Sequence, residues 1–520
     1  MLMGQYHYLV LIDTNNIIDY LFASSKYKLI RGASMILDKL NRSITLALAD
    51  QYRGTILSSS GGESRILFQE EETAEVFMSE VKAAYKKETD EVTLSIVKVI
   101  RNENEKIAEW LLRGEKELRR YELQAGKKER VGFTLSPIMK RCESCYKKVA
   151  EVSVNTPEGE LKYCRSCAAK HDQVNQVQSQ LKQFQQNEQS SFEINGLMEI
   201  HEKLISSVKN GNETTWVKNI AGLLNDENES SYIGFVYADG KNIGKLFREN
   251  LFKKLVDAED EQFIEAYQKI SSGLHQSMID AAVETAKEYE NQSVNVDYAM
   301  VGGDDFVAIM SGKYAVSYTN TLLSKFEEKT SENLGETQQI AAGVVIAKSS
   351  YPIHRLFDLS YQLMTRTKYN NPTSSLDFMI LSDSTIQSVD GIRGDQVIGQ
   401  RHLRAEGYSI SNETEKGLSF NQLYETIVTL KKRGFPRSKI KDLYYLVLEQ
   451  DEDMLTFLWI EWRSRLSREV KEALDHWNSR FYETPFPFVR HSSGEPTYFT
   501  PLLDLFDLYD FVDIEEEVNV

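Results

Sequence analysis

Long apolar runs are missing from this sequence of 520 residues. No stretch approaches the about 18 consecutive apolar residues that a membrane-spanning helix needs. The N-terminal stretch MLMGQYHYLVLID lacks the basic flank of a signal peptide and reaches Asp13 quickly, so it predicts a strand. These absences lead us to expect a cytoplasmic protein that contacts no membrane.

Basic residues are too few for a protein that coats nucleic acid through its overall charge. The chain has 61 Lys and Arg residues against 78 Asp and Glu residues, which gives a net charge of -17. A local basic groove remains compatible with this balance. The length predicts several domains, because one hydrophobic core rarely grows beyond about 250 residues.

Cysteine is scarce, and its four occurrences all lie between residues 142 and 167. Cys142 and Cys145 form one C-x-x-C pair, Cys164 and Cys167 form another, and 18 residues separate the pairs. This spacing predicts a tetrahedral Zn²⁺ site with four thiolate ligands. Disulfides are disfavoured in the reducing compartment that we expect. Because no open coordination position is evident, we interpret the zinc as structural.

Two adjacent carboxylates interrupt an apolar region in the stretch YAMVGGDDFVAIM, residues 298–310. Gly-Gly-Asp between two strand-like runs predicts a hairpin turn, and a plain β-turn with a capping Asp is the alternative. The second acid, Asp305, lies inside an apolar run, where successive side chains point to opposite faces. One of the two carboxylates therefore points towards covered space unless a cation meets it.

A third carboxylate follows an upstream strand. The run Ile233–Tyr237 predicts a buried strand that leads to Asp239. Together with Asp304 and Asp305 it forms an oxygen-only ligand set, which suits Mg²⁺ or Mn²⁺. Two such ions about 4 Å apart serve phosphoryl or nucleotidyl transfer. The stretch GFVYADGK is not a P-loop, because five residues separate its glycines and Asn follows the lysine where Ser or Thr is needed.

This set of motifs resembles the palm domain of the CRISPR polymerase family, the large subunits of type III CRISPR effector complexes. The resemblance rests on the strand-Asp-Gly step, the GGDD hairpin 65 residues later and the strand AAGVVIA at 341–347. The helix YPIHRLFDLSYQLMTRTK and the closing strand 376–381 also fit. The family's palm is similar to those of GGDEF nucleotide cyclases and nucleic-acid polymerases.

The resemblance implies roles for individual residues. Catalysis and binding of two Mg²⁺ or Mn²⁺ ions fall to Asp239, Asp304 and Asp305, with Gly240 also at the metal site. Nucleotide binding is implied at Gly302, Gly303 and Lys368. Many relatives carry another acid at the position of Lys241, so the metal shell here is expected to rest on three carboxylates.

The N-terminal region repeats the same pattern and predicts an internal duplication. LVLIDTNNIIDYLF (9–22) parallels GFVYADGKNIGKLF (234–247), and ILSSSGGESRILF (56–68) parallels AMVGGDDFVAIM (299–310). The alternative is two unrelated α/β units. In the first copy Gly61-Gly62-Glu63-Ser64 replaces GGDD, and the stretch 27–34 also looks like the first palm of CRISPR polymerases.

The duplication suggests two half-sites, because GGDEF cyclases resemble half-sites that must dimerise. We expect the second palm to hold the attacked triphosphate and the first palm to hold the acceptor nucleotide. Gly61 and Gly62 would allow close backbone approach. Ser58, Ser59 and Ser60 are candidate donors to phosphate or ribose.

We therefore expect an α/β (α+β) protein with two ferredoxin-like palms, a zinc ribbon between them and a C-terminal α-helical domain. The predicted boundaries are 1–135 for the first palm, 136–172 for the ribbon, 173–228 for a helical linker, 229–390 for the second palm and 400–520 for the helical domain. The Gln-rich stretch 173–189 predicts a solvated helix or linker. The tail from Asp504 carries seven acids and no base, and we expect its last residues to be mobile. An HD nuclease domain, common among relatives, is not expected here.

The helical domain resembles the one that lies along the RNA-containing filament of effector complexes. A cluster of six basic residues around Gly434 and Pro436, within 431–441, could contact RNA. Basic residues near a helix C-terminus are an equally good reading of the same cluster.

Two functions compete. In the first, the chain condenses ATP into a cyclic oligoadenylate-type messenger for antiviral defence, or makes another cyclic (di)nucleotide, within a type III CRISPR complex or as a standalone relative. In the second, it is mainly a scaffold for guide-RNA-containing effector subunits and target RNA. The intact acids at 239, 304 and 305 favour the first.

Overall fold

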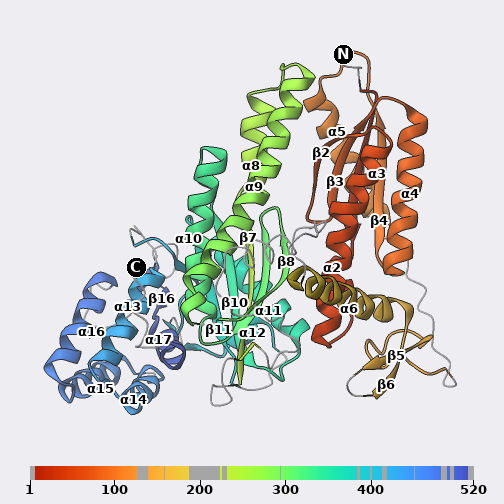
Figure 1. The fold of residues 1–520 in the computed structure, drawn as a ribbon. Coiled ribbons are helices and arrows are strands. Elements are labelled where there is room, and N and C mark those ends of the chain that lie inside the picture. Colours follow the sequence, from red (N-terminus) through yellow and green to blue (C-terminus); the bar gives the residue numbers. More distant parts are fainter. Residues whose placement is uncertain are drawn as a thin grey trace.

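A computed structural model describes two palm-like domains, a small ribbon and a C-terminal domain (Figure 1). Figure 1 shows the ribbon and the C-terminal helices on opposite sides of the molecule. None of the helices in the described part of the chain is long and apolar enough to cross a membrane. The structure describes residues 6–125, 139–156, 159–186, 223–224, 231–292, 294–382, 387–398, 401–412, 418–449, 451–481, 489–491 and 497–512.

The first palm is a four-stranded antiparallel sheet in the order β2-β3-β1-β4, the ferredoxin-like order that we expected. Alternating apolar residues of its central strand are buried on both faces, so helices pack on each side. Its elements are β1 (Tyr8–Asn15), α1 (Ile17–Leu21), α2 (Tyr27–Asp38), a π-helical turn (Lys39–Ile44), α3 (Thr45–Gln51), β2 (Thr55–Ser60), β3 (Glu63–Phe68), α4 (Glu71–Thr89), β4 (Thr93–Ile100) and α5 (Ile107–Ala125).

The second palm repeats this order in the strands β8-β9-β7-β10, and β11 and β14 extend the sheet. The closing strand predicted at 376–381 is present as β11, which pairs with β10 in the parallel direction. Its elements are β7 (Tyr232–Gly240), α8 (Ile243–Phe247), a π-helical turn (Arg248–Lys253), α9 (Asp260–Glu288), a 3₁₀ turn (Glu290–Gln292), β8 (Val296–Gly302), β9 (Asp305–Ser311), α10 (Ala315–Leu334), β10 (Ile340–Lys348), α11 (Ile353–Asn370), β11 (Ser375–Ile380) and α12 (Val389–Gly394).

The ribbon is a two-stranded hairpin followed by one long helix: β5 (Val152–Thr156), β6 (Gly159–Tyr163) and α6 (Arg165–Gln186). The first part of the Gln-rich stretch is therefore helical, in continuation of the ribbon. The rest of the expected helical linker, residues 187–228, lies outside the described residues except for 223–224.

The C-terminal region combines helices with a small sheet in the order β12-β13-β16-β15, which the sequence did not predict. The last residues of the acidic tail, 513–520, lie outside the described residues. The elements are β12 (Val397–Ile398), β13 (Arg401–His402), β14 (Tyr408–Ser409), α13 (Phe420–Lys432), α14 (Arg437–Val447), α15 (Glu452–Ser464), α16 (Arg468–Phe481), β15 (Val489–His491), β16 (Thr497–Phe499), α17 (Leu502–Leu508) and a 3₁₀ turn (Tyr509–Phe511).

The two palms cover each other's sheets reciprocally. Tyr27 and Ile30 of α2 join a buried cluster on the face of the second sheet. In return, Phe263 and Tyr267 of α9 join a buried cluster on the face of the first sheet. Figure 1 shows α9 extending from the second palm along the first. This exchange of apolar surface makes the two domains one packed unit.

Helix α2 also ties the palms together through polar contacts and carries the ribbon. Arg31 forms a buried ion pair with Asp297 of β8. On its other side, Gly32 lies so close to α6 that a Cβ there would be 1.9 Å from the carbonyl oxygen of Lys170. The amino group of Lys170 in turn donates to the Tyr20 carbonyl oxygen at 2.7 Å. The ribbon is thus fixed to the first palm by a helix crossing that requires glycine.

The duplication is confirmed, but its register differs by one residue from the sequence alignment. Asn16 and Asn242 both adopt left-handed backbone conformations, with φ of 60° and 59°, and each directly precedes a short helix. This matches Asp13 with Asp239, as expected. It also places the Leu-Phe pairs, which the alignment had superposed, one position apart.

Candidate functional site

The second hairpin places two acids next to the end of β7. Gly302 pairs with Asp305 across the hairpin, so Gly303 and Asp304 form the turn, and Gly303 has a φ of 60°. The side chain of Asp304 lies against Gly240, where a Cβ would come within 2.7 Å of Asp304 Oδ2. Glycine at position 240 therefore makes room for the carboxylate that the hairpin delivers.

The three acids create a strongly negative, partly buried site. Burial raises the pKa of Asp304 to about 7, with a further contribution from the charge of Asp239. Burial also raises the pKa of Asp305 well above its ordinary value, and its acidic neighbours raise it further. Tyr237 donates a hydrogen bond to Asp305 Oδ1 at 3.2 Å. Neighbouring carboxylates with such pKa values gain stability from a bound cation.

Lys368 reaches this site from α11 and forms an ion pair with Asp239. In the described part of the chain, the carboxylates do not converge as tightly as the cysteines do, since only the cysteines bring all their ligand atoms within 4.8 Å of one another. The acids and their oxygens fit a hard divalent cation, and Lys368 balances part of their charge.

Lys241, where the resemblance expects an acid in many relatives, points away from the carboxylates. Its amino group donates to the carbonyl oxygen of Asn371 at 3.1 Å and to Ser375 Oγ at 2.8 Å. Burial, followed by the charge of Lys368, lowers the pKa of Lys241 to about 8. It therefore anchors the end of α11, the helix that carries Lys368.

The first palm has the same frame with different charges. Asp13 lies directly opposite Glu63 across β1 and β3. The turn of this hairpin is Gly61-Gly62, so Glu63 matches Asp305 and glycine stands where the second palm has Asp304. The sequence alignment, which matched Glu63 with the first acid of GGDD, was one position out.

A residue that the sequence interpretation missed completes this contrast. Glu122 is the sixteenth residue of α5, as Lys368 is of α11, because the helices begin at Ile107 and Ile353. Lys368 pairs with Asp239, whereas Glu122 shares a hydrogen bond with Asp13. Burial raises the pKa of Asp13 to about 7, followed by the contribution of this hydrogen bond and of Glu63. An alignment of α5 with α11 would have revealed the exchange of lysine for glutamate.

The two hairpins meet at their tips and border a cleft of about 510 Å³. A Cβ on Gly302 would lie 3.5 Å from the backbone nitrogen of Gly61. The acids of the second hairpin thus face the half-site of the first palm. The cleft is lined by Ser58, Gly61, Glu63, Arg65, Leu111, Leu112, Glu115, Lys116, Arg119, Ile243, Gly244, Phe247, Arg248, Phe252, Tyr267, Ser271, Leu274, Gly302, Gly303, Asp304 and Asp305.

Four basic residues line this cleft, and they differ in whether they form ion pairs with carboxylates. Arg65 is bound by Glu63 and Glu115. By contrast, no carboxylate of the described residues forms an ion pair with Lys116, Arg119 or Arg248. In a chain with a net charge of -17, three unpaired cations in one cleft form a site for an anion.

The predicted donors of the first hairpin lie in different places. Ser58 lines the cleft, whereas Ser59 donates to the Asn41 carbonyl oxygen at 2.7 Å, inside the first palm. The side chain of Ser60 is outside the described part of the structure. Gly62 faces Ile17, because a Cβ there would lie 2.6 Å from Ile17 Cδ1, while a Cβ on Gly61 would meet no atom within 4 Å. Of the two glycines, only Gly61 borders the cleft.

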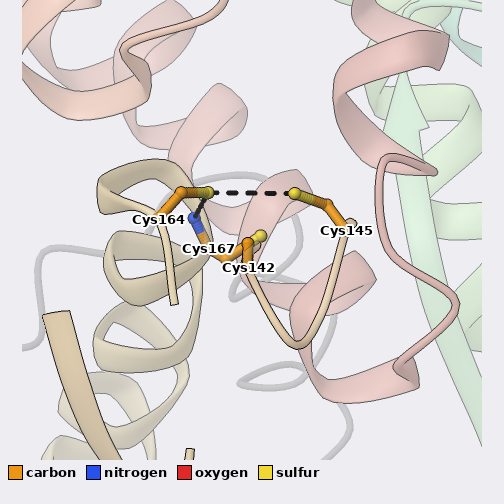
Figure 2. A group of neighbouring side chains, drawn as sticks. All are labelled: Cys142, Cys145, Cys164 and Cys167. Atoms are coloured by element: carbon orange, nitrogen blue, oxygen red, sulfur yellow. Dashed lines mark hydrogen bonds between the residues drawn. The ribbon is translucent and has the colours of Figure 1, made fainter. Parts of the chain in front are cut away.

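The four cysteines converge as the spacing predicts. Figure 2 shows Cys142 and Cys145 on a loop, with Cys164 and Cys167 at the start of α6. Their sulfur atoms lie within 4.8 Å of one another, and Cys145 Sγ and Cys164 Sγ are 3.9 Å apart. Four thiolates around a zinc ion would be separated by about 3.8 Å, given Zn–S bonds of about 2.3 Å. All four are free thiols that fit a closed zinc site.

The basic cluster at 431–441 is largely used within the C-terminal domain. Lys431 donates to the Val512 carbonyl oxygen, and its amino group lies 4.9 Å from the ring centroid of Tyr509. Arg437 pairs with Asp510. These contacts hold the segment after α17 and favour the structural reading of the cluster over an RNA contact.

Comparisons with known proteins support the palm assignment. Residues 232–375 match the family profile described as Cas10/Cmr2, second palm domain. No curated protein sequence is detectably similar to this chain.

Similar solved structures cover most of the chain. The Csm1-Csm4 cassette in complex with pppApApA has a TM-score of 0.53 and 13% identity, covering 91% of this chain and 67% of that chain. The cassette in complex with one ATP has a TM-score of 0.52 and 12% identity, covering 91% and 68%. At these identities the likeness concerns the fold.

The cysteine cluster predicts one bound zinc per chain. Metal analysis of protein purified under reducing conditions without chelator should find about one equivalent of zinc. Cys142→Ser should lower the melting temperature, because metal binding contributes to folding. The exposed Ser153 offers a control in Ser153→Ala, which should keep both the zinc and the melting temperature. Protein free of zinc, with Cys142→Ser as stable as the parent, would contradict the assignment.

The raised pKa of Asp13 predicts that its ionisation costs stability. Its pKa rises from 3.8 to about 7 on folding, so the folded state binds the proton more tightly, and stability falls as pH rises between these values. Asp13→Asn should therefore raise the free energy of unfolding at pH 8, by about 1–2 kcal/mol after allowance for solvent screening. The gain should vanish near pH 4.

Denaturant unfolding at several pH values, without added nucleotide or divalent ion, measures this difference. Asp257→Asn, at an exposed position, is the control and should be neutral throughout. A gain at Asp13 that is the same at pH 4 and pH 8 would show that ionisation is not its cause.

Proposed function

Because residues 232–375 match the second palm domain of Cas10/Cmr2, we propose that this chain is a Cas10-like member of the CRISPR polymerase family and that it joins ATP molecules into cyclic oligoadenylates. The observation that carries the proposal is the contact between the two hairpins, which directs the acids of one palm towards the nucleotide cleft of the other. Both half-sites of a nucleotide cyclase would then lie within one chain at a high effective concentration.

In the proposed reaction the second palm holds the attacked ATP. The 3′-oxygen of the acceptor attacks the α-phosphorus, the bond to the β-phosphate oxygen breaks, and pyrophosphate leaves. The hydroxyl proton passes to solvent. Asp239, Asp304 and Asp305 would hold two Mg²⁺ or Mn²⁺ ions, which lower the pKa of the acceptor hydroxyl and neutralise the phosphate charge. Ring closure is the same step within one linear oligomer.

Lys368 would exchange partners during this cycle. Its amino group pairs with Asp239 in the structure. With Asp239 engaged as a metal ligand, Lys368 would be free to contact the triphosphate of the attacked ATP as a compact positive charge. Lys241 keeps α11 in place for this exchange through its bonds to the end of the helix.

The first palm would hold the acceptor. It has Glu122 at the position that corresponds to Lys368, together with the acids at 13 and 63. The cations for the acceptor's polyphosphate would therefore come from elsewhere in the cleft. Lys116 and Arg119 on α5 and Arg248 after α8 supply them. The linear product pppApApA is bound by the similar Csm1-Csm4 cassette, and a ligand of this kind carries the same 5′-triphosphate.

The biological setting follows from the family. We propose that the chain serves as the large subunit of a type III effector complex, in which guide-RNA-containing subunits and target RNA control the synthesis. The zinc ion would be structural, held by the four cysteines.

The metal acids predict a complete loss of synthesis on mutation. The double change Asp304→Ala and Asp305→Ala should abolish products from labelled ATP and Mn²⁺, in assays with and without RNA. The fold should persist, because removing mutually repelling carboxylates does not cost stability. Asp257→Asn serves as the control. A folded double variant that still forms product would contradict two-metal catalysis, and a parent protein without product would favour the scaffold.

The cleft cations predict a weaker acceptor site. Lys116→Ser with Arg119→Ser should lower product formation about 10- to 100-fold, the effect of losing charge-assisted contacts to phosphate. Calorimetry should still detect ATP at the second palm. Lys87→Ser, an exposed change outside the cleft, is the control. Normal synthesis in the folded double variant would contradict this role.

Substitution of Gly62 would not test the acceptor site cleanly. Its φ is 91° and a Cβ would clash with Ile17, so a bulky residue there disturbs the first palm itself. The cleft cations test the acceptor site without this complication.

A further inference from the structure

The zinc-binding loop displays a strained and exposed tyrosine. Tyr146, directly after Cys145, has a left-handed φ of 56°, and 64% of its surface is exposed. A bulky side chain is disfavoured in this conformation, which suits glycine. Within the described residues the Tyr146 ring makes no hydrogen bond and no aromatic contact. A conformation that costs stability in a residue that leaves most of its surface exposed points to a binding role.

The loop that presents Tyr146 is rigid. Arg141 and Val149 form a β-bridge that closes it. The backbone nitrogen of Cys142 donates to the Lys148 carbonyl oxygen at 2.8 Å, and that of Tyr146 donates to the Cys142 carbonyl oxygen at 3.0 Å. The backbone that carries the exposed ring is therefore already ordered before any ligand binds.

The same loop carries two cations without ion pairs. Most basic side chains of the ribbon contact a carboxylate, and those that do are Lys140, Lys148, Lys162, Arg165 and Lys170. Arg141 and Lys147 are exposed, and neither forms an ion pair with any carboxylate that the structure describes. An exposed aromatic ring on one loop with two free cations is a combination that proteins use for single-stranded nucleic acids.

We propose that the zinc loop binds single-stranded nucleic acid, with an unpaired base stacked on Tyr146 and adjacent phosphates held by Arg141 and Lys147. A duplex fits poorly, because its base faces are covered by stacking. The surface contrasts with the cluster at 431–441, whose cations are largely used within the protein. It is also separate from the nucleotide cleft, none of whose lining residues belongs to the ribbon.

The test uses the full zinc-loaded chain and fluorescent oligo-U RNA and oligo-dT DNA of about 12 nucleotides, a length within the range of single-strand sites. Anisotropy measures affinity at several salt concentrations, and 2-aminopurine in the strand reports stacking through its quenching. Binding of the RNA alone would identify RNA as the ligand, whereas binding of both oligonucleotides would show that the site accepts either nucleic acid.

Three variants separate the contributions. Tyr146→Gly relieves the backbone strain, so its melting temperature should equal or exceed that of the parent, while its affinity falls about 5- to 100-fold and quenching is lost. Tyr146→Phe should keep both. Arg141→Ser with Lys147→Ser should weaken binding and lower the salt dependence by about two phosphate contacts. Tyr121→Ala, an exposed tyrosine on α5, is the control and should bind normally.

Unchanged affinity and quenching in Tyr146→Gly would overturn the proposal. Equal weakening by Tyr121→Ala would do the same, because the effect would then be general. Tight binding to duplex but not to single strands would also contradict it.

Discussion

The contact between the two hairpin tips is the constraint on which the rest of the structure depends. A Cβ on Gly302 would lie 3.5 Å from the Gly61 backbone nitrogen, and Gly61 has a left-handed φ of 61° that favours glycine. The reciprocal packing of α2 and α9 on the opposite sheets holds the tips together with buried apolar surface. As a result, the acids of the second palm and the cations of the first palm face one cleft, although they are far apart in the sequence.

The asymmetry of the palms follows from a few exchanged charges in a common frame. The pair Lys368–Asp239 in the second palm corresponds to Glu122–Asp13 in the first. The second palm therefore combines three acids with a lysine, whereas the first lacks both the turn acid and the lysine. In the proposed function, Lys116 and Arg119 of α5 and Arg248 take the place of this lysine at the first palm, which suits a ligand that is held rather than attacked.

Local sequence patterns predicted much of this fold. The Asp-Gly step, the GGDD turn and the C-x-x-C pairs each have a short-range physical cause, so the palms and the thiol cluster could be expected. The one-residue register error arose because apolar strands align equally well when shifted, and only the left-handed Asn16 and Asn242 settle the match. Glu122 acts through a tertiary contact with Asp13, which only an alignment of α5 with α11 would have indicated. Arg119 lines a cleft between the palms, and no local pattern marks it. The basic cluster at 431–441 shows the converse, since its partners lie near residue 510.

The central claim is that both half-sites lie in one chain, and mixing two impaired variants tests it most directly. One variant carries Asp304→Ala with Asp305→Ala, and the other carries Lys116→Ser with Arg119→Ser. Each chain would then keep only one intact half-site. The account predicts that product formation in the equimolar mixture equals the mean of the two separate activities. Recovery of a substantial fraction of the parent activity on mixing would contradict it, because the site would then form between chains.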